Sequence, residues 1–140
     1  MATINATVTI GSDITGQNVS ISKTMQMTKA GTTLGLENTS GLSAKTVQTE
    51  TAFKLFGNAD ASTLKASKVY IRNTGSSSTD FFYIGFGEDL AAATIETIGR
   101  LYGNDWMLIP WDAVAATTHD IYAKASTAEV MTLEFMAFIE

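Results

Sequence analysis

The segment KVYIRNTGSSSTDFFYIGFG, residues 68–87, carries the pattern that decides the fold. Apolar side chains alternate with others in its first run, at Val69 and Ile71, and again in its second, at Phe82 and Ile84. An alternation with a period of two is typical of a β-strand that buries one face. The six residues TGSSST between the runs exceed a tight hairpin turn, so we expect an exposed, flexible connection.

The same alternation recurs on both sides of this segment. Further strand candidates are residues 4–10, 18–28, 46–56, 98–103, 105–113, 120–126 and 129–140. In the first two of these, threonine and serine fill most of the alternate positions, which predicts a hydroxyl-lined outer face. Only DLAAATIETI, residues 89–98, is compatible with a helix, and threonine limits it to a turn or two. Pro110, the sole proline, is expected at a strand end or on an edge strand.

About eight short strands, separated by turns roughly every 8 to 12 residues, indicate an all-β fold. Irregular connection lengths favour Greek-key crossings over a simple meander. We therefore predict an antiparallel β-sandwich of the jelly-roll type, with little helix. The 140 residues are expected to form a single domain over residues 1–140.

The composition excludes several classes of function. Charged residues make up only 16% of the chain, the net charge is −5, and the nine basic residues are scattered, so we expect no nucleic-acid binding. Without cysteine there is no disulfide, thiolate metal site or cysteine nucleophile. Residues 1–13 lack the basic and apolar regions of a signal peptide, and no run has the roughly 18 to 20 apolar residues of a membrane span.

Candidates for catalysis or metal binding are few. His119 is the only histidine, no G-x-S-x-G elbow is present, and a solvated turn residue in TTHD is the favoured interpretation. Gly85, Gly87, Glu88 and Asp89 lack the pattern of a nucleotide-binding loop. The acidic pair could bind calcium or serve a glycosidase, but adjacent strand residues point in opposite directions, which favours a solvated strand end. We predict no catalytic residue, no metal and no cofactor.

Three aromatic residues are the best candidates for a binding surface: Tyr102, Trp106 and Trp111. The two tryptophans are an odd number of positions apart, so a regular strand places them on opposite faces unless Pro110 bulges it. One tryptophan is then expected in the core and the other at a surface. A surface aromatic could stack on a sugar ring or anchor a protein–protein contact.

Three segments together resemble small β-sandwich proteins of tailed bacteriophages, among them capsid decoration (cement) proteins and head or tail accessory proteins. These are KVYIRNTG followed by FFYIGFG, then IGRLYGNDWMLIPWDA, then IYAKASTAEVMTLEFMAFIE. The resemblance covers about the C-terminal half and rests on packing motifs, so it transfers no functional residue. It implies a non-enzymatic virion protein, made in the host cytoplasm, that binds the major capsid protein and forms a dimer or trimer.

Two other classes of function stay open at this point. One is a tail-fibre or baseplate module that binds host glycans, with Trp106 or Trp111 as the stacking platform. The other is a β-sandwich hydrolase that uses His119 or the Glu88–Asp89 pair.

Overall fold

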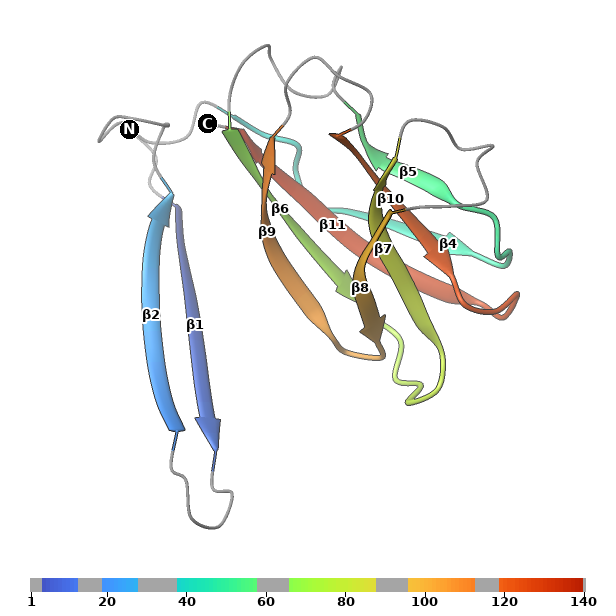
Figure 1. Ribbon diagram of the computed structural model, residues 1–140, viewed down its shortest axis with the longest axis horizontal. Helices are drawn as coiled ribbons and strands as arrows, with labels where there is room; N and C mark the ends of the chain where they lie inside the picture. The colour runs from blue at the N-terminus through green and yellow to red at the C-terminus, as the bar shows by residue number, and fades with distance from the viewer. Residues whose placement is uncertain are drawn as a thin grey trace. The chain divides into compact units, whose positions relative to one another are not determined.

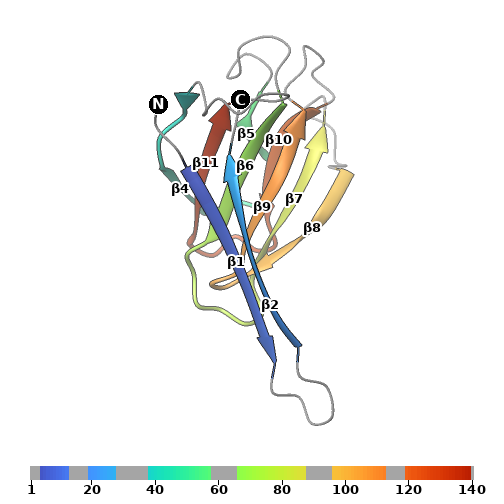
Figure 2. The ribbon, with the colours of Figure 1, turned by 90° about the vertical axis from the view of Figure 1, so that its left-hand side faces the viewer.

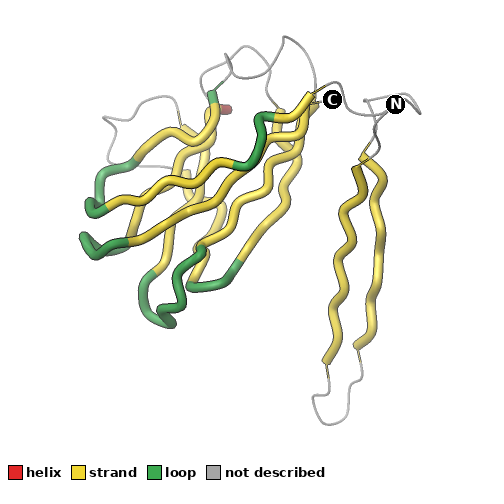
Figure 3. Tube along the Cα trace, turned by 180° about the vertical axis from the view of Figure 1, so that it is seen from behind, coloured by secondary structure: helices red, strands yellow, loops and turns green. Residues whose placement is uncertain are grey.

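The computed structural model describes residues 4–12, 19–27, 38–57, 66–87, 96–112 and 119–139. Apart from a single-residue 3₁₀ turn at His119, these residues form strands and loops (Figure 3). They belong to two compact units, one N-terminal to residue 38 and one spanning residues 38–139. Each unit is described by itself.

The N-terminal unit contains a two-stranded antiparallel ribbon, β1 (Ile4–Ser12) and β2 (Val19–Met27). The expected alternation is present: the register places apolar residues opposite each other on one face, such as Ile10 opposite Ile21. The other face carries hydroxyl pairs, with Thr7 Oγ1 2.8 Å from Thr24 Oγ1. Within the described residues, β1 and β2 pair only with each other and not with the sheets of the sandwich. The β-sandwich that we predicted over residues 1–140 therefore has its described strands within residues 38–139.

The second unit holds nine strands in two antiparallel sheets (Figures 1 and 2). They are β3 (Asn38–Thr39), β4 (Ser43–Val47), β5 (Phe53–Phe56), β6 (Ala66–Asn73), β7 (Phe81–Gly87), β8 (Glu96–Tyr102), β9 (Trp106–Asp112), β10 (Asp120–Ala125) and β11 (Met131–Ile139). One sheet has the order β5-β10-β7-β8, and the other has the order β3-β11-β6-β9, with β4 also paired to β11.

This strand order is that of a jelly roll, as the sequence predicted. Taking the eight strands from β4 to β11, every connection except the one between β7 and β8 crosses from one sheet to the other. The two four-stranded orders, β4-β11-β6-β9 and β5-β10-β7-β8, interleave strands from both halves of the unit. Because β11 pairs with β6 on one side and with β3 and β4 on the other, the C-terminal strand lies inside a sheet.

The core lies between the two sheets. Val69 and Ile71 on β6 and Phe82 and Ile84 on β7, the residues that first indicated the fold, are all fully buried. They pack with inward side chains of the other strands: Val47, Phe53, Leu55, Phe56, Leu101, Trp111, Ile121, Ala123, Ala125, Met131, Leu133 and Ala137. Pro110 lies on β9, an edge strand, as expected for the sole proline.

One detail of the strand prediction was wrong. The run 46–56 is not one strand but the end of β4 and the whole of β5, which belong to opposite sheets. Between them the backbone N–H of Thr51 donates to Thr49 Oγ1, forming a local turn that breaks the ladder. In the suggested helix 89–98, residues 96–98 belong to strand β8, and the remaining residues lie outside the described part of the chain.

Candidate functional site

Strand β9 presents the two tryptophans to opposite sides of its sheet, as their spacing predicted. Trp111 is 1% exposed and belongs to the core, whereas the side chain of Trp106 is 49% exposed. The register pairs Trp106 with Arg72, which points away from the core because its neighbour Ile71 points into it. The ring of Trp106 lies 6.5 Å from that of Tyr70 on the adjacent strand β6.

These two rings belong to a larger apolar surface on the outer side of the five-stranded sheet. The register places six outward apolar side chains on β6, β9 and β11, and we call them the Trp106 face: Tyr70, Trp106, Leu108, Pro110, Met136 and Phe138. Pro110 and Trp106 are exposed, and the other four are half-buried. An outer sheet face of a single isolated domain is ordinarily polar, so this surface is suited to contact another molecule.

Three charged side chains lie on the same side of the sheet as the Trp106 face: Lys68, Arg72 and Glu134. Arg72 Nη1 lies 3.8 Å from Glu134 Oε2, and both side chains are partly exposed. Lys68 pairs in register with Pro110, and partial burial lowers the pKa of its ammonium from the ordinary value of 10.5. The cause is desolvation, because the partly buried ammonium has lost part of its hydration.

Tyr102 lies on the outer side of the other sheet. Its ring centroid is 5.0 Å from that of Phe81, which in turn lies 4.9 Å from Tyr83. The guanidinium of Arg100 lies over Phe81 at 4.8 Å and over Tyr83 at 5.4 Å. These contacts hold Tyr102 in an aromatic cluster with a cation above it, and Tyr102 is half-buried there. The three aromatic candidates are therefore in three separate places.

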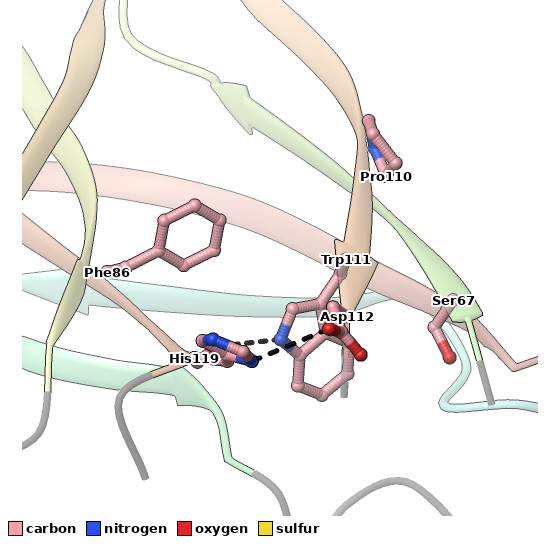
Figure 4. A pocket seen from close by; sticks show the side chains of 6 residues that line it. All are labelled: Ser67, Phe86, Pro110, Trp111, Asp112 and His119. Carbon is pink, nitrogen blue, oxygen red and sulfur yellow. Dashed lines mark hydrogen bonds and ion pairs between the residues drawn. The ribbon is translucent and has the colours of Figure 1, made fainter. Parts of the chain in front are cut away.

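The buried Trp111 lines a cavity of about 480 Å³ at one end of the sandwich (Figure 4). The cavity is formed where β7 and β9 end and where β6 and β10 begin. Its described lining consists of Ser67, Phe86, Pro110, Trp111, Asp112 and His119. The indole N–H of Trp111 donates to the backbone oxygen of His119 at 2.7 Å, so the indole also fixes the backbone at the start of β10.

Ser67, His119 and Asp112 are residue types of a hydrolytic triad, but their geometry is different. His119 Nδ1 lies 3.8 Å from Asp112 Oδ2, which is beyond hydrogen-bond distance. Among the described residues, neither Ser67 Oγ nor His119 Nδ1 has a hydrogen-bond partner. Ser67 and His119 stand apart in Figure 4, with Trp111 and Asp112 drawn between them. A nucleophile bonded to its base, which is the basic requirement of a triad, is not formed.

His119 is a partly solvated turn residue. Its side chain is 45% exposed, but its Nδ1 atom is buried beside the cavity. Sequence reasoning did not single out Ser67, because nothing in the local pattern marks a serine at the start of a strand. Its relevance depends on the register, which places it opposite Trp111.

Gly85 and Gly87 agree with the interpretation of this segment as a strand end, since β7 ends at Gly87. Glu88 and Asp89 lie outside the described residues, so the calcium and glycosidase alternatives stay untested. Within the described ranges, no group of three or more histidine, aspartate or glutamate side chains is arranged to hold a metal ion. The described residues also form no helix with the length and apolar character that crossing a bilayer requires.

Comparison with known proteins gives no relative: no protein-family model, no curated protein and no solved structure matches this chain.

Proposed function

We propose that the protein is a non-enzymatic structural component of a bacteriophage particle, a capsid decoration (cement) protein that binds the major capsid protein on the outside of the shell. The observation that carries the proposal is the Trp106 face, an apolar surface on the outer side of a sheet whose other side packs in the core. Tryptophan and tyrosine are the residues that most often dominate protein–protein binding energy. The resemblance of the C-terminal half to phage proteins supplies the kind of partner.

The stabilising role follows from thermodynamic linkage between binding and the state of the shell. A protein that binds only the expanded shell stabilises that state in proportion to its occupancy. Self-association into a dimer or trimer would multiply weak contacts by avidity. Such a protein is made in the host cytoplasm and ends in the virion, without cofactor, metal, nucleic acid or membrane as a partner.

Two experiments test the proposal. Electron cryomicroscopy of native particles is expected to show copies of the chain on the outer surface of the shell. In a binding assay with shells that lack the protein, Trp106→Ala is expected to weaken binding at least about 10-fold, because truncating an exposed tryptophan that anchors a protein–protein contact costs roughly 2 kcal/mol or more. Ile98→Ala is the control, since Ile98 is 45% exposed and lies on β8, which belongs to the other sheet. If both variants bound shells with the affinity of the unchanged chain, the Trp106 face would not be the surface that contacts the shell.

The alternative function is a tail or fibre accessory module that binds host glycans. The exposed Trp106, with Tyr70 beside it, is the observation that favours it, because two neighbouring rings can stack on a sugar. Trp111 is not available for this role, since only 1% of it is exposed. Saturable quenching of Trp106 fluorescence by host surface polysaccharide, together with no binding to shells, would favour this alternative.

A further inference from the structure

The outer side of the four-stranded sheet carries two cations beside a cluster of aromatic rings. Tyr83 on β7 is opposite Arg100 of β8 in one register and opposite Lys124 of β10 in the other. The neighbours of Tyr83 along β7, Phe82 and Ile84, are fully buried in the core, so Tyr83 and its two partners point away from the core. We call this surface the Arg100 face: Phe81, Tyr83, Arg100, Tyr102 and Lys124.

The cations of the Arg100 face are suited to an acidic partner. Arg100 is exposed and Lys124 is half-buried. Within the described ranges, neither of them forms an ion pair with a carboxylate. The guanidinium of Arg100 is held over the ring of Phe81, and a guanidinium that stacks on a ring can still bind a carboxylate through its N–H groups. On a chain with a net charge of −5, this surface is a local exception to the overall acidic character.

One end of the same sandwich has the opposite charge. Four connections lie at this end, where β4, β6, β8 and β10 finish and β5, β7, β9 and β11 begin (Figure 3). Each connection contains one carboxylate and neither lysine nor arginine. We call these four residues the acidic end: Glu50 in residues 48–52, Asp80 in residues 74–80, Asp105 in residues 103–105 and Glu129 in residues 126–130.

The two surfaces also match in spacing. Arg100 and Lys124 are on β8 and β10, which have β7 between them, so these strands are about 10 Å apart. At the acidic end, the connection that holds Asp80 lies between those that hold Asp105 and Glu129. These two connections are therefore also separated by two strand spacings, about 10 Å. One copy can bring two carboxylates to the two cations of another.

We propose that the Arg100 face of one copy binds the acidic end of a second copy of the chain. The contact joins two different surfaces, so it is made twice in a dimer or repeats around a closed ring such as a trimer. It does not use the Trp106 face, which belongs to the other sheet. The inference rests on the self-association that is part of the proposed function. Its test uses no shell, so its failure is distinguishable from a failure of the virion role.

Sedimentation of the full chain without shells measures the contact. The mass is expected to rise with concentration towards that of a dimer or trimer. Arg100→Glu is expected to weaken this association at least about 10-fold, because it sets like charges against each other. Lys45→Glu is the matched control, since Lys45 is also an exposed cation over a phenylalanine ring, 4.6 Å from that of Phe53, but lies on β4 of the other sheet. The control should change the association less than about 3-fold.

A mixture of two variants tests which surfaces meet. The second variant carries Glu50→Arg and Glu129→Arg, at two exposed residues whose carboxylates make no hydrogen bond or ion pair within the described part of the chain. Alone, it should associate as weakly as Arg100→Glu. Mixed in equal amounts, the two variants should associate at least about 10-fold more tightly than either alone, because each negative surface then meets a positive one.

The proposal is overturned if the unchanged chain stays monomeric at about 1 mM, if Arg100→Glu and Lys45→Glu have equal effects, or if the mixture associates no more tightly than its parts. The first outcome needs no variant, so it decides the matter even if a variant does not fold. Undiminished self-association of Arg100→Glu together with weakened binding to shells would also overturn it, and would make the shell the partner of the Arg100 face.

Discussion

At the scale of single residues, Gly103 is a position of the sandwich that leaves no room for a side chain. It lies in the turn between β8 and β9, next to Asn104, whose φ of 68° is of the left-handed kind that asparagine accepts. The backbone N–H of Gly103 donates to the oxygen of Ser77 at 3.0 Å. A Cβ atom on Gly103 would lie only 2.6 Å from the backbone N and O of Ser77. The connection from β6 to β7 and the turn from β8 to β9 are therefore in backbone contact.

We expect Gly103→Ala to lower the free energy of unfolding by about 1 to 3 kcal/mol, because two backbone segments must separate to admit the methyl group. The measurement is the denaturation midpoint in urea. Gly99→Ala on β8 is the matched control, since a Cβ there meets nothing within 4 Å, and its effect should stay within about 0.5 kcal/mol. Equal midpoints for the two variants would show that this contact is not tight.

This contact also explains a limit of the sequence prediction. Residues 74–79 read as an exposed, flexible connection because serine, threonine and glycine dominate them. In the structure, the buried Asn73 ties their start to the other turn: its Nδ2 donates to the oxygen of Leu101, and its Oδ1 accepts from the N–H of Gly75, both at 3.0 Å. Such anchoring depends on partners about 28 positions away along the chain, which composition does not reveal.

The tryptophans show what residue-level reasoning can and cannot reach. Their odd spacing was enough to separate a core position from a surface position, because the period of a strand is local. It could not say which one was buried. That depends on β9 pairing with β6, which puts Trp111 on the side of Val69 and Ile71. The cavity beside Trp111 required four strand ends to meet, and no local pattern predicts that.

At the scale of elements, alternation located the strands well but not every break between them. The run 46–56 kept its apolar phase through the turn at Thr49 and Thr51, so periodicity alone joined two strands of opposite sheets. Strands β6 to β11 were located more accurately, since glycine-rich or polar turns separate their apolar runs.

The ribbon of β1 and β2 is the element whose stability needs the most explanation. A two-stranded ribbon is marginally stable alone in water. Its apolar face includes Ile10, Val19, Ile21 and Met25, which are 40% to 51% exposed, and Lys23 is the single charged residue in the two strands. A sheet of two strands has no second layer of its own to cover such a face. In the proposed virion, the ribbon would lie with this face against a neighbouring capsid subunit.

We therefore expect the double substitution Ile10→Lys and Ile21→Lys to weaken binding to shells at least about 10-fold, because two buried isoleucines contribute roughly 1.5 to 3 kcal/mol each. The two positions face each other in the register. Co-sedimentation with shells that lack the protein measures the effect.

The control for this variant is Thr9→Lys with Ser22→Lys, an opposed pair on the hydroxyl-bearing face. It adds the same two charges at neighbouring positions, so it reproduces any repulsion between lysines across the ribbon. Binding by the control should fall less than about 3-fold. If both pairs weaken binding equally, charge rather than the apolar face is responsible.

At the scale of the whole molecule, the fold class was predictable because many weak local signals agreed. Short alternating strands, irregular connections and scarce helix signals indicated a jelly roll, and the strand order confirms it. The function was not predictable in the same way, since a jelly roll serves many unrelated roles. The few charged residues, 16% of the chain, and the apolar outer faces of sandwich and ribbon are the features that favour assembly with other proteins.

This distribution of charge predicts how the assembled state responds to salt. Contacts through the Trp106 face and the ribbon would be mainly apolar, and apolar contacts are not screened by ions. The affinity for shells should therefore change less than about 3-fold between about 50 and 200 mM NaCl, whereas a protein held by phosphate contacts loses roughly 10³- to 10⁵-fold over that range. Titration of shells with the labelled chain at both salt concentrations measures this. A steep loss of affinity would mean that charged side chains, and not the apolar faces, carry the binding.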